Sequence, residues 1–360
     1  MRLRWIMPVL LGIGLGGCDP MNGHPMNADA DVWPDGEVSD AELLDQGIIA
    51  DEGFDGRIEA LRLHHMQVRG TINSYHDTCE GCQLVELPYR HRPLFEQAAV
   101  QGIRQFDFDV FGGGGDGSLV EVARGLSAVD NRHVCRDTSL LSCLRELADF
   151  SDAHPGHLPL IILVGSTILP PDDPFPFFWH IDELEEQAVR AFGRERILTP
   201  DEVRGRHPDL ATALAEEGWP PVDRVRGKVL LVLNDRGEGR EEYIEFGGIG
   251  PDERYMFIIG DPAHPAPDEV IYSFQDIDGD VEALAEIERL VDERRLVHAA
   301  TDDPDMVSAL RMVGAHLVAT GFPDEVFDPV GDAVARCNPL TAPDDCEAAR
   351  FEPTWEPPAE

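Results

Sequence analysis

The chain has 360 residues, of which 42% are hydrophobic, so it can bury one large core or two modest ones. It carries 69 Asp and Glu against 29 Lys and Arg, which gives a formal net charge of −40. A field of that sign repels nucleic acid and anionic bilayers at long range, which argues against nucleic-acid binding. The charge suits a protein exposed to salt or divalent cations, but it is also typical of a solvated acidic surface.

The first 18 residues have the pattern of an export signal. Arg2 and Arg4 precede an apolar stretch, Trp5–Leu15, that is too short to span a bilayer. Residues 15–18 (L-G-G-C) resemble a bacterial lipobox, in which the thiol of Cys18 takes a diacylglycerol and becomes the new N-terminus. The alternative is an ordinary signal peptide with an incidental cysteine. We expect a lipoprotein of the bacterial cell envelope, anchored in a membrane through Cys18 and facing the periplasm or the exterior.

Composition divides the rest of the chain into three parts. Residues 19–55 are acidic, with scattered Gly, Pro and Asn, and predict a tether that holds the domain off the membrane. Residues 56–336 alternate apolar runs with helical patterns and are the expected folded domain. Residues 337–360 are rich in Pro, Asp and Glu and predict an irregular tail pinned by one disulfide.

Eight apolar runs are predicted to be strands, because most are short and bounded by Gly, Pro or Asp. They are Met66–Ile72, Ile103–Phe111, Leu119–Ala123, Leu158–Val164, Lys228–Leu233, Tyr255–Ile259, Leu296–Ala299 and His316–Thr320. Helical patterns at Ser139–Phe150, Ile181–Phe192 and Val281–Arg294 lie between several of them. Alternating strands and helices predict an α/β fold, and eight strands predict a single, distorted TIM (β/α)8-type barrel. The glycine-rich run 111–117 lacks the G-K-[ST] of a phosphate loop and is expected to be a turn at the barrel mouth.

Export implies an oxidising compartment, so the cysteines are expected to pair. Removing Cys18 from the seven leaves six, and closeness in sequence favours three local bridges: Cys79–Cys82, Cys135–Cys143 and Cys337–Cys346. Cys79 and Cys82 have an alternative interpretation as half a zinc site or a redox C-x-x-C. The sequence has no second C-x-x-C, and His76 alone does not complete a tetrahedral set, so a disulfide is favoured.

Polar residues stand where the first two predicted strands end. Asn73 and His76 end the first strand, and Asp107 and Asp109 lie at the end of the second. Barrel enzymes place their reacting groups at these ends, and the i, i+2 spacing points both carboxylates to one side. Two carboxylates and an amide carbonyl suit a hard cation such as Ca²⁺. The alternative is a solvated strand edge, which the apolar residues flanking both aspartates disfavour.

The same two stretches carry a family resemblance. Residues 70–76 (G-T-I-N-S-Y-H) and 102–110 (G-I-R-Q-F-D-F-D-V) resemble the first two catalytic strands of the calcium-dependent phosphoinositide-specific phospholipase C family, which are G-T-H-N-S-Y-H and G-x-R-x-x-E-x-D. Further similar segments follow in order: Ala153–Leu160, Leu198–Gly205, Gly218–Pro220, Arg226–Leu230 and Gly314–Pro323. The resemblance spans roughly 61–323 and implies a barrel of the PI-PLC-like phosphodiesterase kind.

The resemblance also implies a mechanism that this chain has partly lost. In the family one histidine takes a proton from the inositol 2-hydroxyl, calcium and a basic residue stabilise the phosphorane charge, and a second histidine protonates the leaving alcohol. Here Ile72 stands at the first histidine position and Arg124 near the second. An arginine can stabilise a phosphate but cannot act as the acid at neutral pH. Other family positions are also substituted, at Gly165, Thr167, His298, Ala300, Gly321 and Phe322.

Three functions are consistent with these residues. The first is an exported lipoprotein with a PI-PLC-like phosphoric diester hydrolase domain, acting with Ca²⁺ on phosphoinositide-type or other phosphodiester substrates, with weak or lost activity. The second is an inactive pseudoenzyme that binds a phosphate- or sugar-bearing ligand, and the third is a structural surface lipoprotein. The candidate site residues are His76 and Arg124 for catalysis and Asn73, Asp107 and Asp109 for the metal. His76 is a candidate substitute base, although the family also has histidine there, which favours a structural or substrate-contact role.

Overall fold

The computed structural model describes residues 60–77, 89–111, 120–122, 132–166, 181–235, 240–241, 243–244, 254–275, 277, 280–327 and 334–351. Residues Ile58–Glu360 form one compact unit. The predictions made for Cys18, Cys79, Cys82, Arg124 and Thr167 concern residues outside the described part of the chain.

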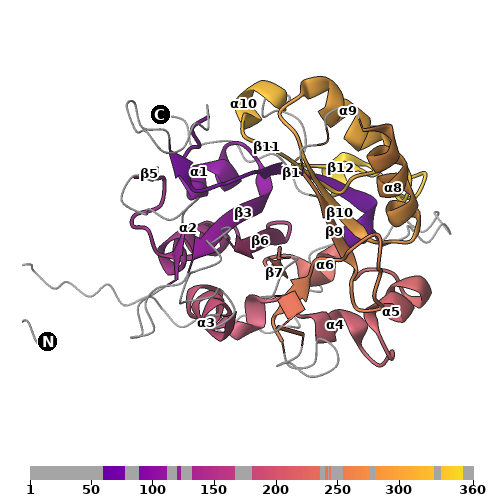
Figure 1. The fold of residues 1–360 in the computed structure, drawn as a ribbon, viewed down its shortest axis with the longest axis horizontal. Coiled ribbons are helices and arrows are strands. Elements are labelled where there is room, and N and C mark those ends of the chain that lie inside the picture. The colour runs from indigo at the N-terminus through magenta and orange to yellow at the C-terminus, as the bar shows by residue number, and fades with distance from the viewer. Residues whose placement is uncertain are drawn as a thin grey trace, which may run out of the picture. The chain divides into compact units, whose positions relative to one another are not determined.

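Eight parallel strands form the centre of this unit (Figure 1). In spatial order they are β8 (Met256–Ile258), β7 (Val229–Leu233), β6 (Leu160–Ser166), β3 (Ile103–Phe111), β1 (Met66–Thr71), β11 (Leu317–Thr320), β10 (Leu296–Ala300) and β9 (Ile271–Phe274). A parallel bridge between Ile259 and Ile271 links the two ends of this order. The sheet is therefore a nearly closed barrel, which confirms the predicted α/β barrel.

One predicted strand is not part of the barrel. The run Leu119–Ala123 contains only β4 (Glu121–Val122), which pairs antiparallel with β3 as a side ribbon. The eighth barrel strand is instead β9, which was not predicted. Its signal was present, because Val270-Ile271-Tyr272-Ser273-Phe274 is a β-branched and aromatic run after a proline-rich stretch.

Helices surround the barrel (Figure 1). The three predicted helices are confirmed as α2 (Leu140–Ala153), α3 (Ile181–Phe192) and α8 (Val281–Asp292). Side-chain caps begin two of them: Ser139 accepts from the Ser142 N–H, and Asp280 accepts from the N–H groups of Glu282 and Ala283. The other helices are α1 (Leu94–Ala99), α4 (Pro200–Arg204), α5 (Leu210–Glu216), α6 (Val222–Val225), α9 (Pro304–Met312) and α10 (Pro323–Val326).

Alternation along the strands separates two apolar clusters. On β3, Phe106, Phe108 and Val110 pack with the helices, in one cluster with residues such as Leu144 and Leu147 of α2. A second cluster includes alternate residues of the barrel strands, Val68, Ile161, Leu163, Leu230, Val232, Phe257 and Leu317. Asp107 and Asp109 alternate with the helix-facing residues, so they lie on the face of β3 turned towards the barrel axis.

The N-terminal end of the barrel is covered by segments distant in sequence. Trp219 is fully buried there, and β12 (Ala335–Cys337) pairs antiparallel with the start of β1. The Cys337–Cys346 disulfide closes the following loop, and Phe351 beyond it is also fully buried. The Cys135–Cys143 disulfide joins β5 (Arg132–His133) and its following turn to α2. Two of the three predicted pairings are therefore confirmed, and the third, Cys79–Cys82, lies outside the described residues.

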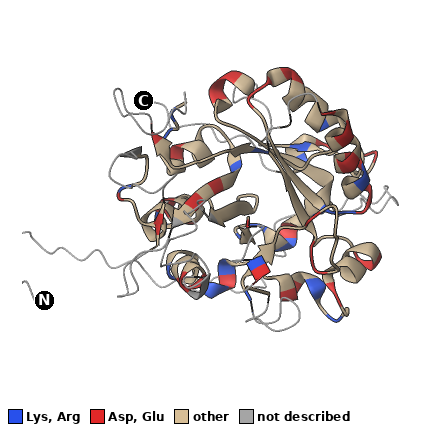
Figure 2. Cartoon of the chain, in the orientation of Figure 1, with Lys and Arg blue, Asp and Glu red and all other residues tan. Residues whose placement is uncertain are grey.

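Acidic side chains are spread over the outer helices, among them α8, α9 and α10 (Figure 2). This distribution agrees with a solvated acidic surface. Among the described residues, no helix is long and apolar enough to cross a membrane.

Candidate functional site

The turn after β1 is locked to β3 through one aspartate and one serine. The Ser74 N–H donates to the Asp107 carbonyl oxygen at 2.9 Å, and the Asp107 N–H donates to Ser74 Oγ at 2.8 Å. Asn73 takes a left-handed conformation with φ of 43°, which asparagine tolerates better than most residues. This conformation turns the chain sharply, so the residues after β1 return towards β3.

The structure brings the predicted metal ligands to one place. The Asn73 N–H donates to Asp107 Oδ2 at 3.3 Å, and Asp109 lies two residues further along β3. The Tyr75 hydroxyl donates to Asp109 Oδ2 at 3.2 Å. Asp107 is buried and Asp109 is half-buried. The two carboxylates therefore sit at the mouth of the barrel, held by groups from the β1 turn.

The donor chemistry of this group suits calcium only in part. Asp107, Asp109 and the side-chain oxygen of Asn73 provide hard oxygen donors, whereas Ca²⁺ takes six to eight oxygens. Within the described ranges, no group of three or more His, Cys, Asp or Glu side chains is arranged to hold a metal ion. The remaining ligands would have to come from water, from a substrate or from residues outside those ranges.

Tyr89, which the sequence did not indicate, fills the space beside Asn73. Its hydroxyl accepts a hydrogen bond from Asn73 Nδ2 at 2.7 Å, which fixes the amide and leaves Asn73 Oδ1 turned away from this bond. The Tyr89 ring lies edge-on to the rings of His76 and Phe322, with centroid distances of 5.5 and 5.6 Å. A Cβ at Gly321 would overlap the Tyr89 ring. An aromatic side chain thus occupies the end of β11.

His91 is a second residue that sequence reasoning missed. Its Nε2–H donates to the carbonyl oxygen of Ile72 at 2.9 Å, and its Nδ1 is buried without a hydrogen-bond partner in the described structure. Burial lowers the pKa of His91 to about 4, although the hydrogen bond to Ile72 acts in the opposite direction. A neutral histidine is therefore bound to the backbone of Ile72, the residue that the resemblance sets at the position of the family's catalytic base. No spacing rule marks it, because the contact depends on a segment that folds back over β1.

His76 is packed rather than exposed. It belongs to β2 (His76–Asp77), where it pairs across the ribbon with His133 of β5. Only 5% of the His76 side chain surface is exposed, and its ring contacts Tyr89. Burial, and then the proximity of His76, lower the pKa of His133 to about 4. These positions place His76 in a wall of the mouth.

Three further positions that the resemblance marks as substituted, His298, Gly165 and Ala300, add no charged group to the barrel strands at neutral pH. His298 is fully buried on β10, where its Nδ1 lies 2.9 Å from the Ser273 hydroxyl, and burial lowers its pKa to about 4. Gly165 on β6 pairs with Asp109, and Ala300 ends β10. A Cβ at Gly165 would lie 3.0 Å from the Asn234 carbonyl oxygen, so the neighbouring strand leaves little room for a larger side chain.

The barrel and its oxygen-rich mouth define a PI-PLC-like phosphodiesterase domain. The model of the family described as Ca²⁺-dependent phosphoinositide phospholipase C matches residues 125–339, more than half of the chain. The chain belongs to this family. The match begins after both motifs at 70–76 and 102–110, so those motifs are independent support.

Solved structures show the same fold. A calcium-dependent phosphoinositol-specific phospholipase C from Pseudomonas sp. has a TM-score of 0.57 at 15% identity, covering 77% of this chain and 95% of that one. The myo-inositol complex of the Pseudomonas protein gives the same TM-score and identity, with 77% and 96% covered. A Ca²⁺-dependent phosphatidylinositol-specific phospholipase C from Streptomyces antibioticus has a TM-score of 0.55 at 17% identity, covering 74% and 98%. No curated protein matches the sequence.

Proposed function

We propose that the protein is an exported lipoprotein whose barrel mouth binds a phosphodiester or phosphoinositide-like headgroup together with Ca²⁺, and that it hydrolyses this ligand weakly or not at all. The proposal rests on one observation: the oxygen ligands expected for calcium are present at the mouth, whereas an isoleucine stands where the family has its histidine base. Asn73, Asp107 and Asp109 converge at the mouth, while Ile72, the residue before Asn73, directly follows β1. Membership of the family supports the ligand class.

The residues of the mouth support binding better than proton transfer. Calcium, when bound, supplies positive charge against the phosphate. Asp107, Asp109 and Asn73 Oδ1 would hold it, with Tyr89 orienting the Asn73 amide. Ile72 has no group that accepts a proton, and Arg124 stays charged at neutral pH. His91 binds the Ile72 carbonyl oxygen through its Nε2–H, and burial lowers its pKa to about 4, so its remaining nitrogen, Nδ1, is a weak proton acceptor and a poor replacement for the missing base.

Calcium titration of the purified protein tests the proposal. We expect saturable binding of Ca²⁺ by calorimetry, and we expect Asp107→Asn to weaken it at least about tenfold because a carboxylate ligand is lost. The control is Asp324→Asn in α10, which removes an equal charge from an exposed residue paired with Arg92. Calcium binding that is absent, or equally affected by both variants, would favour the structural-lipoprotein alternative.

Turnover then separates the enzyme from the binding protein. Ordinary enzymes reach about 1–10³ s⁻¹, and we expect wild-type hydrolysis of phosphatidylinositol to fall far below this range. A wild-type rate within it that Asp109→Ala abolishes would show that the site is intact. Binding of the headgroup with no turnover would identify the pseudoenzyme.

The lipid anchor makes a separate prediction. Each buried CH₂ of an acyl chain contributes about 0.8 kcal/mol to membrane binding. If Cys18 carries such chains, the mature protein should therefore partition into the detergent phase of a two-phase extraction. Cys18→Ser should move it to the aqueous phase, whereas Met21→Ser, just outside the lipobox, should not. Wild-type protein found in the aqueous phase would rule out the lipoprotein assignment.

A further inference from the structure

A pocket at the opposite end of the barrel from the mouth has no role in the proposed function. It has a volume of about 270 Å³ and is lined by His64, His65, Asp292, Arg294, Leu340, Thr341 and Pro343. η1 (Leu63–His65) precedes β1, and Arg294 lies just before β10, so both belong to the N-terminal ends of barrel strands. The loop closed by the Cys337–Cys346 disulfide forms the remaining wall.

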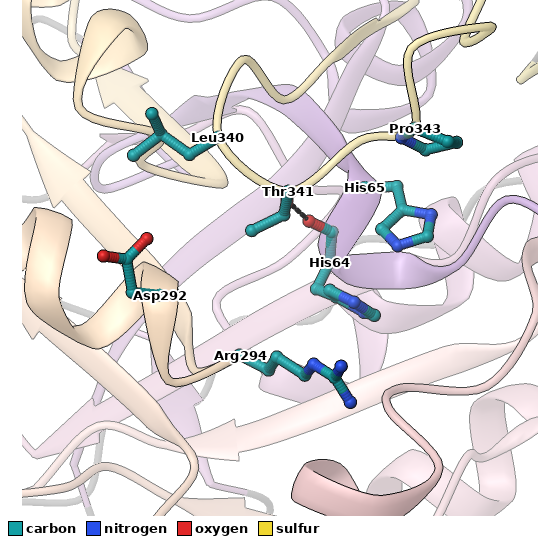
Figure 3. A pocket seen from close by; sticks show the side chains of 7 residues that line it. All are labelled: His64, His65, Asp292, Arg294, Leu340, Thr341 and Pro343. Atoms are coloured by element: carbon teal, nitrogen blue, oxygen red, sulfur yellow. Dashed lines mark hydrogen bonds between the residues drawn. The ribbon is translucent and has the colours of Figure 1, made fainter.

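Two histidines and one arginine meet on one side of this pocket. Figure 3 shows the His64 ring between the His65 ring and the Arg294 guanidinium, with Asp292 and Leu340 across from them. The rings of His64 and His65 have centroids 4.2 Å apart. A Cβ on Gly218, which has a φ of 71°, would lie 3.1 Å from His64 Cε1 and 3.8 Å from Arg294 Nη1, so these two side chains converge over that glycine.

The Arg294 charge is not balanced by a carboxylate. Its Nη1 donates to the carbonyl oxygens of Leu214 and Ala215 at 3.0 Å, but no described Asp or Glu lies within 4.0 Å of the guanidinium. This is unexpected in a chain with 69 acidic residues. Arg294 also has a φ of 59°, a conformation that most residues adopt only when the surroundings impose it. The fold thus holds an exposed, unbalanced cation at the pocket.

The ring nitrogens of His64 and His65 can form hydrogen bonds to a ligand in the pocket. The Arg62 N–H donates to His65 Nδ1 at 3.2 Å, so the proton of the neutral His65 ring is on Nε2. His64 is only 4% exposed, and its Nδ1 has no hydrogen-bond partner within the described structure. Its carbonyl oxygen accepts from Thr341 Oγ1 and from His316 Nε2, which fixes its backbone. A buried polar atom without a partner is costly, and a polar ligand would satisfy it.

We propose that this pocket binds a small oxyanion, such as the phosphate group of a phosphomonoester, between Arg294 and the two histidines. Arginine recognises phosphate through charge-assisted hydrogen bonds, and neutral histidines add N–H donors. The volume leaves room for a small organic group beside Leu340 and Pro343. Asp292 is the one acidic side chain of the lining, and it should limit the affinity.

Titration of the full chain with inorganic phosphate at constant ionic strength tests this site. Saturable 1:1 binding is expected, and Arg294→Gly should weaken it about 10- to 100-fold because a charge-assisted contact is lost. Glycine is the suitable replacement because it accepts the positive φ of this position. Asp292→Asn should tighten binding by removing a negative charge. The matched control is Arg289→Ala in α8, the helix that ends at Asp292; the Arg289 side chain pairs with Glu286 instead of lining the pocket.

The outcomes distinguish this pocket from the mouth of the barrel. Binding that Arg294→Gly weakens, and that Asp109→Asn leaves unchanged, supports the proposal whether or not the proposed function holds. Absence of saturable phosphate binding up to tens of millimolar would overturn it, as would binding that Asp109→Asn abolishes. A divalent cation that binds in place of phosphate and is lost in Asp292→Asn would also overturn it. The resonances of His64 and His65 provide a local readout, because they should shift on binding in wild type.

Discussion

Replacing Ile72 and Arg124 together by histidine is expected to raise calcium-dependent hydrolysis of phosphatidylinositol above the wild-type rate by about 10²-fold or more. A general base or a general acid each contributes roughly 10²–10⁴-fold, and the double variant supplies a group for both. Either single variant should gain much less, because residues that act as a unit are not additive. Position 72 follows Val68 and Gly70 in the alternation of β1, so its side chain is on the axial side of the barrel.

The matched control is the double variant with glutamine at both positions, which is polar but transfers no proton. Initial rates with phosphatidylinositol vesicles, with calcium and with a chelator, provide the measurement. An equal gain in the glutamine and histidine variants would show that polarity, not proton transfer, limits the wild type. The rate of the histidine variant should remain below that of an ordinary enzyme. A Cβ at Gly165 would lie 3.0 Å from the Asn234 carbonyl oxygen, so this position cannot readily accept a charged side chain.

Acidification should destabilise the barrel through its buried histidines. Burial lowers the pKa values of His298 and His316 from 6.5 to about 4. In the unfolded chain each would take up a proton near pH 6.5, so their stabilising contribution is complete above that pH and is lost as the pH falls towards 4. Each such histidine should lower the free energy of unfolding by up to about 1.4 kcal/mol per pH unit in this interval.

Urea unfolding between pH 7 and pH 4.5 measures this slope. Relief of the repulsion among 69 acidic residues acts in the opposite direction, so the informative quantity is the difference between variants. His298→Asn keeps a polar group near the Ser273 hydroxyl. It should make the free energy of unfolding depend less steeply on pH, by the equivalent of about one proton taken up on unfolding. His264→Asn, at an exposed position beside Asp261, serves as the control. Identical slopes in wild type and His298→Asn would contradict the assignment of a neutral buried His298.

The barrel was predictable because several of its strands, such as β6 and β7, are apolar on both faces. Seven of the eight predicted runs contain a barrel strand, since buried parallel strands appear in the sequence as short continuous hydrophobic runs. β9 was missed although Ile271, Tyr272 and Phe274 are β-branched or aromatic, and Leu119–Ala123 misled because an antiparallel side ribbon is equally apolar. An apolar segment in the sequence does not show which strand it will pair with, or whether that pairing is parallel.

The candidate site was predictable only where it follows strand periodicity. The i, i+2 spacing of Asp107 and Asp109 placed both carboxylates on the axial face, and the end of β1 placed Asn73 beside them. Tyr89 and His91 were not predicted because their contacts join a returning segment to β1 and β11. Such contacts depend on tertiary packing, which local sequence patterns do not encode.

The close packing of Tyr89 against Gly321 fixes the order in which substitutions at these two positions can occur. Because a Cβ at 321 would overlap the tyrosine ring, no side chain can be gained there while Tyr89 remains in place. A lineage that returned an acidic residue to the end of β11 would first need a smaller residue at 89, and that intermediate would lose the hydroxyl that holds Asn73. Selection from a library randomised at 321 alone should therefore return glycine. A library randomised jointly at 89 and 321 should return larger residues at 321 only with small ones at 89.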